Sequence, residues 1–128
     1  MGNRAHNFAD THILVAECER IIALDLRGML NRMGYATIEH AYSSEEALIK
    51  IRNQKPDVLI MDELIDGHSH GGELGKSIAR NFKIPVMLLT ASLDESRHHA
   101  RMRNVRLVHK PFGEKEILAS LKSILKNK

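Results

Sequence analysis

Cysteine, secretion signals and long apolar runs are scarce in this sequence, and each shortage excludes a class of protein. One cysteine among 128 residues excludes an internal disulfide and favours a reducing cytoplasm. No apolar run approaches the roughly 20 residues that a membrane-spanning helix needs, so we expect no membrane insertion. The polar start MGNRAHNFAD argues against a signal peptide and predicts a disordered tail over residues 1–11.

The residues that are present are typical of one globular domain, which we place at residues 12–128. Hydrophobic residues make up 43% of the sequence and charged residues 27%, a balance that allows a folded core. The net charge of +3 is unevenly spread: residues 1–64 hold 7 basic and 10 acidic residues, whereas residues 65–128 hold 12 and 6. This asymmetry predicts a polarised surface, with nucleic-acid binding as the weaker interpretation.

Short runs rich in Val, Ile and Leu alternate with helical patterns. The predicted strands are His12–Ala16, Ala36–Ala41, Asp57–Met61, Pro85–Thr90 and Val105–His109. The first predicted helix runs from about Arg20 to Met33, two others open with capping-box patterns at Ser43 and Ser92, one carries Leu74, Ile78 and Phe82, and the last follows Pro111. Five strands alternating with five helices predict an α/β fold, a doubly wound parallel sheet with helices on both faces.

Chemically active side chains stand where the predicted strands end. Glu17 follows the first strand, Asp62 the third and Lys110 the fifth, and Thr90 ends the fourth. The carboxyl ends of parallel strands share one edge, so we expect these residues to lie together. A carboxylate can attack phosphorus or bind magnesium, and a hydroxyl and an ammonium group suit phosphoryl oxygens. Each could be an ordinary polar strand end, but four suitable types at one edge favour a phosphoryl site.

Four segments together resemble the receiver domain of two-component response regulators. They read ILVAECE (13–19), DVLIMD (57–62), IPVMLLTA (84–91) and HKPF (109–112). The resemblance covers about residues 12–126. It implies a flavodoxin-like strand order, 2-1-3-4-5, in a single-domain regulator similar to those of chemotaxis.

The resemblance also implies roles for individual residues. Asp62 would accept a phosphoryl group from a histidine kinase or phosphotransfer protein. Magnesium would be held by Asp62, by Glu17 through water, and by the backbone carbonyl of Leu64. Thr90 would be the switch hydroxyl that moves toward the phosphoryl group, and Lys110 would pair with its oxygens and precede a cis peptide bond. The implied protein is a signalling switch that acts by protein contact, and it is not an enzyme beyond handling its own phosphoryl group.

Cys18 departs from the family pattern, which has a second metal-binding acid at this position. A thiol is a soft ligand and magnesium prefers hard oxygen ligands, so we expect weak magnesium binding and slow phosphorylation. Glu19 or Glu63 could compensate. The alternative function is a degenerate receiver that serves as a phosphorylation-independent interaction module. The thiol itself either fills space or has a redox or soft-metal role.

Further departures concern the switch and the loop after the acceptor. Leu107 replaces an aromatic residue whose rotation couples to the switch hydroxyl in the family, so the output motion must differ. The apolar Leu64 cannot orient a hydrolytic water, which predicts a slow autophosphatase. His68 and His70 form a pair in a loop that is one residue longer than usual, and they are either solvated, metal-binding or pH-responsive.

A basic segment follows Ser92. Four arginines are predicted to form a basic face beside the last helix: Arg97, Arg101, Arg103 and Arg106. This face is either a solvated surface or a docking face for an acidic downstream protein. Nucleic-acid binding is not expected, because the sequence shows neither a helix-turn-helix nor stacking aromatics. A phosphatase or flavodoxin-like enzyme is disfavoured, because Leu64 stands where the first needs a second Asp, and the acids after the first strand would repel a bound phosphate.

Overall fold

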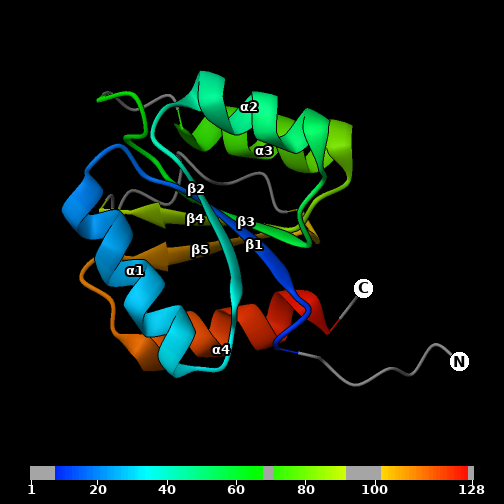
Figure 1. Cartoon of the computed structure of the whole chain (residues 1–128). Helices are drawn as coiled ribbons and strands as arrows, with labels where there is room; N and C mark the ends of the chain where they lie inside the picture. The colour runs from blue at the N-terminus through cyan, green and yellow to red at the C-terminus, as the bar shows by residue number, and fades with distance from the viewer. Residues whose placement is uncertain (1–7, 68–70, 92–101, 127–128) are drawn as a thin grey trace, which may run out of the picture.

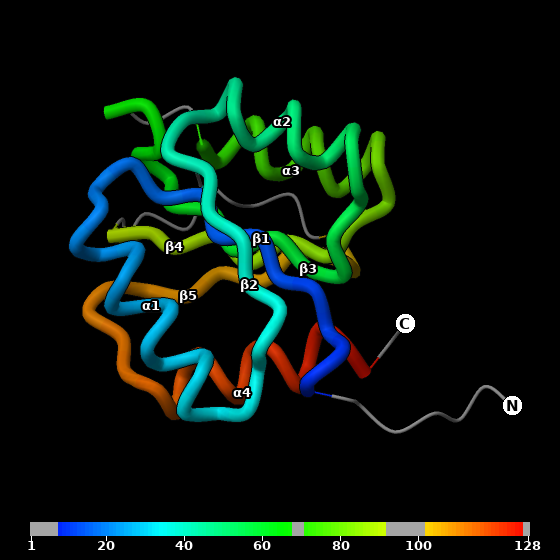
Figure 2. The backbone as a smooth tube through the Cα atoms, viewed as in Figure 1, coloured from blue at the N-terminus to red at the C-terminus, as the bar shows by residue number. Residues whose placement is uncertain are grey.

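The computed structural model describes residues 8–67, 71–91 and 102–126, which form a layered α/β domain (Figure 1). Its five strands are β1 (His12–Ala16), β2 (Thr37–Ala41), β3 (Val58–Asp62), β4 (Val86–Thr90) and β5 (Val105–His109). They form one parallel sheet in the order β2-β1-β3-β4-β5. The predicted fold class and strand order are therefore confirmed, and the backbone trace shows β1 and β3 running through the middle of the molecule (Figure 2).

Four helices in the described part of the chain cover the two faces of the sheet. They are α1 (Arg20–Arg32), α2 (Ser44–Asn53), α3 (Gly71–Phe82) and α4 (Glu114–Leu125). Helices α2 and α3 lie on one face, and α1 and α4 lie on the other (Figure 1). The helix predicted to open at Ser92 falls on residues 92–101, which lie outside the described residues.

The core consists of two hydrophobic layers, because successive strand residues point to opposite faces of a sheet. Ile13 and Val15 of β1 pack toward α1 and α4, whereas Leu14 and Ala16 pack toward α2 and α3. Every residue of β1, β3 and β4 is buried, as expected of central parallel strands covered on both sides. Rigid strands thus fix the place where each chain segment leaves the core.

Local sequence signals set the helix ends. Gly34 has a φ of 107°, the left-handed conformation that commonly follows a helix, and it lies just beyond the end of α1. The Ser43 hydroxyl accepts a hydrogen bond from the backbone N–H of Glu46 and caps α2. The Glu46 carboxylate accepts from the N–H of Tyr42 at 2.7 Å, one residue before the partner that the capping-box pattern predicts.

Residues 8–11 require a correction, because they were expected to lie in a disordered tail. The Phe8 ring packs on the Tyr35 ring with 4.6 Å between centroids, and the Thr37 hydroxyl donates to the Ala9 carbonyl at 3.1 Å. Thr11 is buried and its N–H donates to the Phe8 carbonyl. The physical reason is that a large apolar ring gains free energy by covering another ring at the edge of the core.

Candidate functional site

The carboxyl ends of four strands bring the predicted residues to one edge of the sheet. Asp62 and Thr90 are the last residues of β3 and β4, and Glu17 and Lys110 directly follow β1 and β5. The register of the parallel pairs puts these strand ends at the same level. The four residue types are therefore gathered where sequence reasoning predicted them.

Both carboxylate oxygens of Asp62 accept hydrogen bonds. Lys110 Nζ donates to Oδ2 at 2.7 Å, and the backbone N–H of Leu64 donates to Oδ1 at 2.7 Å. The Asp62 side chain is 4% exposed, while that of Lys110 is 29% exposed. The lysine therefore links a buried carboxylate to the surface, and its charge can compensate a second anion that arrives there. The Lys110–Pro111 peptide bond is cis, as expected.

Glu17 supplies a second buried carboxylate beside Asp62. Its Oε2 accepts from the N–H of Glu19 at 3.0 Å, while its buried Oε1 has no hydrogen-bond partner among the described residues. Burial, followed by the neighbouring Asp62 carboxylate, raises the pKa of Glu17 to about 7. A divalent cation bound between these two buried carboxylates would reduce their mutual repulsion and give the unpartnered oxygen of Glu17 a ligand.

Cys18 lies beside the carbonyl that is expected to complete the metal site. Its Sγ is 3.6 Å from the carbonyl oxygen of Leu64. Burial and then the carboxylate of Glu17 raise the pKa of the Cys18 thiol, which keeps it protonated and unsuited to a hard cation. At this position the site therefore has a neutral sulfur where a carboxylate would add charge.

The donor set fits a small hard cation with few protein ligands. Glu17, Asp62 and the Leu64 carbonyl offer only oxygen, and Mg²⁺ commonly takes one or two carboxylates while keeping several waters. Within the described ranges, no group of three or more His, Cys, Asp or Glu side chains is placed to hold a metal ion.

Glu63 also belongs to this site. From the sequence it was expected only as a possible substitute for the acid missing at Cys18, and its contact with Thr90 was not predicted. It is 6% exposed, and its Oε1 accepts a hydrogen bond of 2.6 Å from the fully buried hydroxyl of Thr90. The signal in the sequence was an acid directly after the buried run of β3, next to Asp62. Its partner could not be predicted, because that depends on the side-chain direction of a neighbouring strand.

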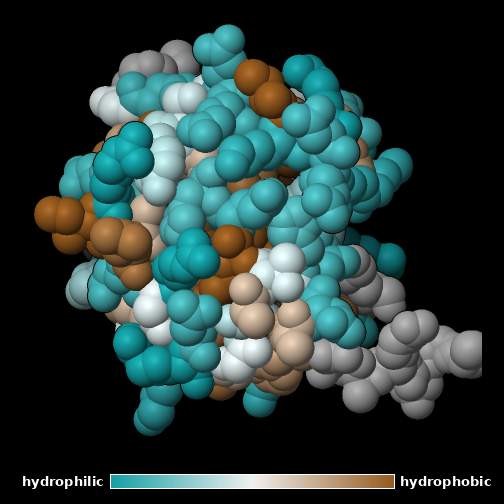
Figure 3. Space-filling model, viewed as in Figure 1, coloured by the Kyte–Doolittle hydropathy of each residue, from teal (hydrophilic) through white to brown (hydrophobic). Residues whose placement is uncertain are grey.

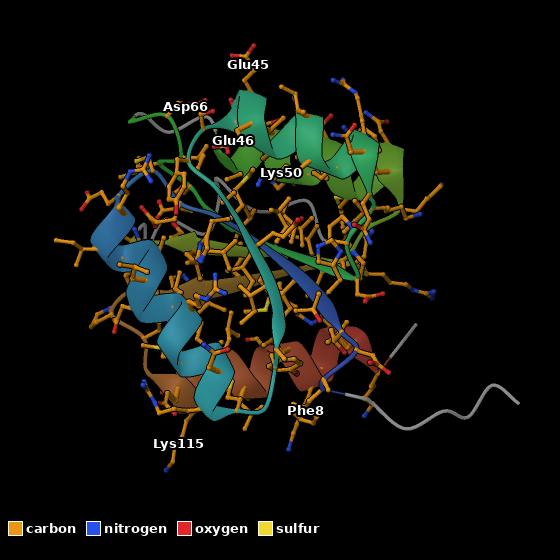
Figure 4. The ribbon with its side chains drawn as sticks, in the orientation of Figure 1. Phe8, Glu45, Glu46, Lys50, Asp66 and Lys115 are labelled. Carbon is orange, nitrogen blue, oxygen red and sulfur yellow. The ribbon has the colours of Figure 1, made fainter. Side chains whose placement is uncertain are left out.

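The loop between β3 and α3 is tied at both ends. The carboxylate of Asp66 accepts from the N–H of Ser44 at 2.9 Å and from its hydroxyl at 2.5 Å, next to the start of α2 (Figure 4). The N–H of Gly71 donates to the Glu63 carbonyl at 2.9 Å. A Cβ at Gly71 would lie 2.5 Å from the carbonyl oxygens of Asp62 and Glu63, so this close approach requires glycine.

The structure describes two of the residues that depart from the family pattern, Leu107 and Leu64. Leu107 is half-buried on β5 and packs against the core layer under α2 and α3. Leu64 is 43% exposed beside Asp62, so its side chain gives the rim of the site an apolar surface. The histidine pair, His68 and His70, lies outside the described residues.

The predicted basic face is described only in part, because Arg97 and Arg101 lie outside the described residues. Arg103 is exposed. The guanidinium of Arg106 donates to the Arg103 carbonyl at 2.8 Å and to the Ser123 hydroxyl at 3.3 Å, which ties it to α4.

An apolar surface lies next to the site, on the helix that follows Glu17. Ile21 and Leu24 of α1 are 82% and 62% exposed, and the space-filling view shows apolar atoms on the α1 side of the molecule (Figure 3). Exposed apolar side chains near a reactive group are suited to contact with a partner protein.

Comparison with known proteins places these features in a family. A sequence model of the response regulator receiver domain matches residues 13–122. The phyllosphere-induced regulator PhyR of Methylorubrum extorquens is 29% identical over 117 residues, which are 90% of this chain and 43% of PhyR. The chain thus spans less than half of that curated relative.

Solved structures give the same result. A putative response regulator from Chloroflexus aurantiacus is 31% identical with a TM-score of 0.76, covering 91% of this chain and 99% of that one. The anti-anti-sigma factor PhyR from Bartonella quintana is 26% identical with a TM-score of 0.78, covering 91% of this chain and 48% of that one. Across the part of the chain described here, no helix has the length and apolar character needed to cross a membrane.

Proposed function

The chain belongs to the response regulator receiver domain family, and we propose that it accepts a phosphoryl group on Asp62 as part of a two-component phosphorelay. The observation that supports this most is the ion pair between Lys110 Nζ and Asp62 Oδ2 at 2.7 Å. A buried carboxylate with one partly exposed cation has both a nucleophile and a charge that can follow the transferred group.

The proposed reaction uses this chain's own residues in simple roles. An Asp62 oxygen attacks phosphorus, and the donor's imidazole leaves as the new acyl phosphate forms. Lys110 shifts from the carboxylate to a phosphoryl oxygen, because the added charge lies nearer the surface. The N–H of Leu64 keeps the carboxylate oriented through Oδ1.

Magnesium is proposed as the cofactor, bound weakly. Glu17, Asp62 and the Leu64 carbonyl would hold it, and Cys18 would contribute nothing to a hard cation. When bound, the ion would supply positive charge that stabilises the negative charge on the oxygens of the phosphoryl group during transfer.

Receiver domains interact with kinases or partner proteins, and for this chain we propose two contacts. A histidine kinase or phosphotransfer protein would approach the site over the exposed side chains of α1. A downstream protein would dock on the predicted basic face, partly described through Arg103 and Arg106. We propose that the protein is cytoplasmic and binds neither membranes nor nucleic acid. We also propose that it has no enzymatic activity beyond slow loss of its own phosphoryl group.

The first test is intact-mass spectrometry after incubation with acetyl phosphate, with and without Mg²⁺. We expect a magnesium-dependent gain of one phosphoryl group in the wild type and none in Asp62→Asn. Circular dichroism of both proteins controls for folding. A folded wild-type protein that gains no phosphoryl group under any divalent ion contradicts the proposal.

The second candidate is a phosphorylation-independent interaction module. Cys18 Sγ beside the Leu64 carbonyl favours it, because the site then lacks one metal-binding charge. The same experiment separates the two candidates: absence of phosphorylation in the wild type that is restored in Cys18→Asp would support the module.

A further inference from the structure

Glu63 stands directly after the proposed acceptor and has no role in the reaction derived above. It is only 6% exposed, and a buried carboxylate needs hydrogen-bond partners to remain charged. Thr90 Oγ1 donates to its Oε1 at 2.6 Å. A hydroxyl that donates to an ionised carboxylate makes a charge-assisted hydrogen bond, which is stronger than a neutral one. The bond joins β3 to β4 at the edge where phosphoryl transfer is proposed.

The hydroxyl of Thr90 has one proton and donates one hydrogen bond at a time. In this structure the proton is directed at Glu63. Thr90 has no exposed surface, so bulk water cannot take the place of a protein acceptor. The switch role expected of Thr90 requires the same proton for a phosphoryl oxygen on Asp62. Glu63 and the phosphoryl group therefore compete for a single donor.

We propose that Glu63 is a positioning residue that holds the Thr90 hydroxyl in the unphosphorylated protein and releases it when Asp62 carries a phosphoryl group. The inference rests on the proposed function of Asp62. No covalent bond changes: the hydrogen bond from Thr90 Oγ1 to Glu63 Oε1 breaks, and one from Oγ1 to a phosphoryl oxygen forms. Because the first bond is charge-assisted, breaking it lowers the affinity of the site for a phosphoryl group. Glu63 thus sets a threshold for switching.

The test measures the affinity for beryllofluoride, a phosphoryl mimic, at high Mg²⁺ concentration. The methyl resonance of Thr90 in an NMR titration reports both binding and the rearrangement of this side chain. Glu63→Gln keeps the shape of the residue and leaves a neutral, weaker acceptor. We expect this variant to bind beryllofluoride about tenfold more tightly than the wild type, since charge-assisted hydrogen bonds are about twice as strong as neutral ones.

A second background separates the hydrogen bond from simple charge repulsion. Thr90→Val removes the hydroxyl and nearly preserves the shape. In that background, Glu63→Gln should change the affinity by less than about twofold, because no hydroxyl remains to be held. An equal gain in both backgrounds overturns the inference, as does an unchanged affinity in Glu63→Gln alone.

Glu73→Gln is the charge-matched control, because it removes one carboxylate from the first turn of α3. We expect its affinity to stay within about twofold of the wild type. A tenfold gain in this control would trace the effect of Glu63→Gln to net charge and overturn the inference.

The outcomes also separate this inference from the proposed function. If the wild type binds beryllofluoride as tightly as Glu63→Gln does, the proposed function stands and only the inference about Glu63 is overturned. Wild-type protein and Glu63→Gln that both bind nothing, and take up no phosphoryl group, overturn both. Binding by Glu63→Gln alone supports the inference in its strongest form.

Discussion

Single residues decide how much charge the site holds, and Cys18 is the first of them. Its Sγ lies 3.6 Å from the Leu64 carbonyl, so a carboxylate at this position would join the oxygen donors of Glu17 and Asp62. We predict that Cys18→Asp lowers the Mg²⁺ concentration for half-maximal phosphorylation by about tenfold or more, because magnesium affinity follows the charge and number of oxygen ligands.

Phosphorylation rates measured across a Mg²⁺ series test this prediction. Cys18→Ser is the matched control, since it offers an oxygen of similar size without the charge and should give a much smaller change. Identical Mg²⁺ dependence in Cys18→Asp and the wild type would contradict it.

Glu17 should make the stability of the folded protein depend on pH. Its pKa is raised in the folded protein from 4.5 to about 7, chiefly by burial, so the metal-free folded state binds more protons than the unfolded state between these values. The free energy of unfolding therefore falls as the pH rises from about 4.5 through 7. The loss is at most about 3 kcal/mol, at 1.36 kcal/mol per pKa unit.

Urea unfolding in the presence of a chelator, at pH 5 and pH 8, measures this loss. Glu17→Gln should remove most of it and leave the variant more stable than the wild type at pH 8. Equal pH dependence in the two proteins would show that another group is responsible.

Residue positions in the site were predictable where they depend on strand ends. Asp62, Thr90 and Lys110 each follow an apolar run, and parallel strands must bring such positions together. The bond between Glu63 and Thr90 was not predictable, because it depends on rotamers on two neighbouring strands and leaves no periodic pattern in the sequence.

The bounds of the five strands were predicted to within one residue at each end, and the differences have local causes. β1 and β5 have the predicted bounds, whereas β3 begins one residue later than predicted, at Val58. Asp57 remains bound to β1, since its N–H donates to the His12 carbonyl and its carboxylate accepts from the His12 N–H, each at 2.8 Å. A side chain that competes for backbone hydrogen bonds thus shifts the end of a strand.

The start of α3 gives a prediction at the scale of elements. Gly71→Ala should lower the free energy of unfolding by about 1–3 kcal/mol, because its Cβ would lie 2.5 Å from two carbonyl oxygens that cannot move freely. Chemical denaturation of the variant and the wild type measures the difference.

Gly28→Ala in α1 is the matched control. A Cβ there would meet one atom of Arg32 at 3.4 Å, so the better helix propensity of alanine should stabilise this variant by up to about 1 kcal/mol. Equal effects of the two substitutions would mean that close approach at Gly71 is unimportant.

Across the whole molecule, the two ends of the sheet have different roles. The carboxyl ends of the strands carry the side chains of the proposed phosphoryl site, and residues 8–11 close the core near the amino ends of β1 and β2. This contact was not predicted, because a polar segment with one aromatic residue shows no periodicity from which to infer packing.

Phe8→Ala tests this separation of roles. We expect a loss of about 1–2 kcal/mol in the free energy of unfolding, less than for a fully buried ring, because Phe8 is only partly buried on Tyr35. Denaturant titration measures the loss. The phosphorylation rate well below the melting temperature should stay within about twofold of the wild type, and a larger fall would show that the two ends are coupled.

The hydrogen bonds between Ser44 and Asp66 connect the loop after Asp62 to the start of α2. Asp66 is four residues beyond Asp62 and holds the first turn of α2 through two hydrogen bonds. A change in the loop that weakens them would loosen that turn, where Glu45 is exposed to solvent. A fluorescent reporter attached at position 45 would therefore follow changes at the proposed acceptor, Asp62, in real time without taking part in the reaction.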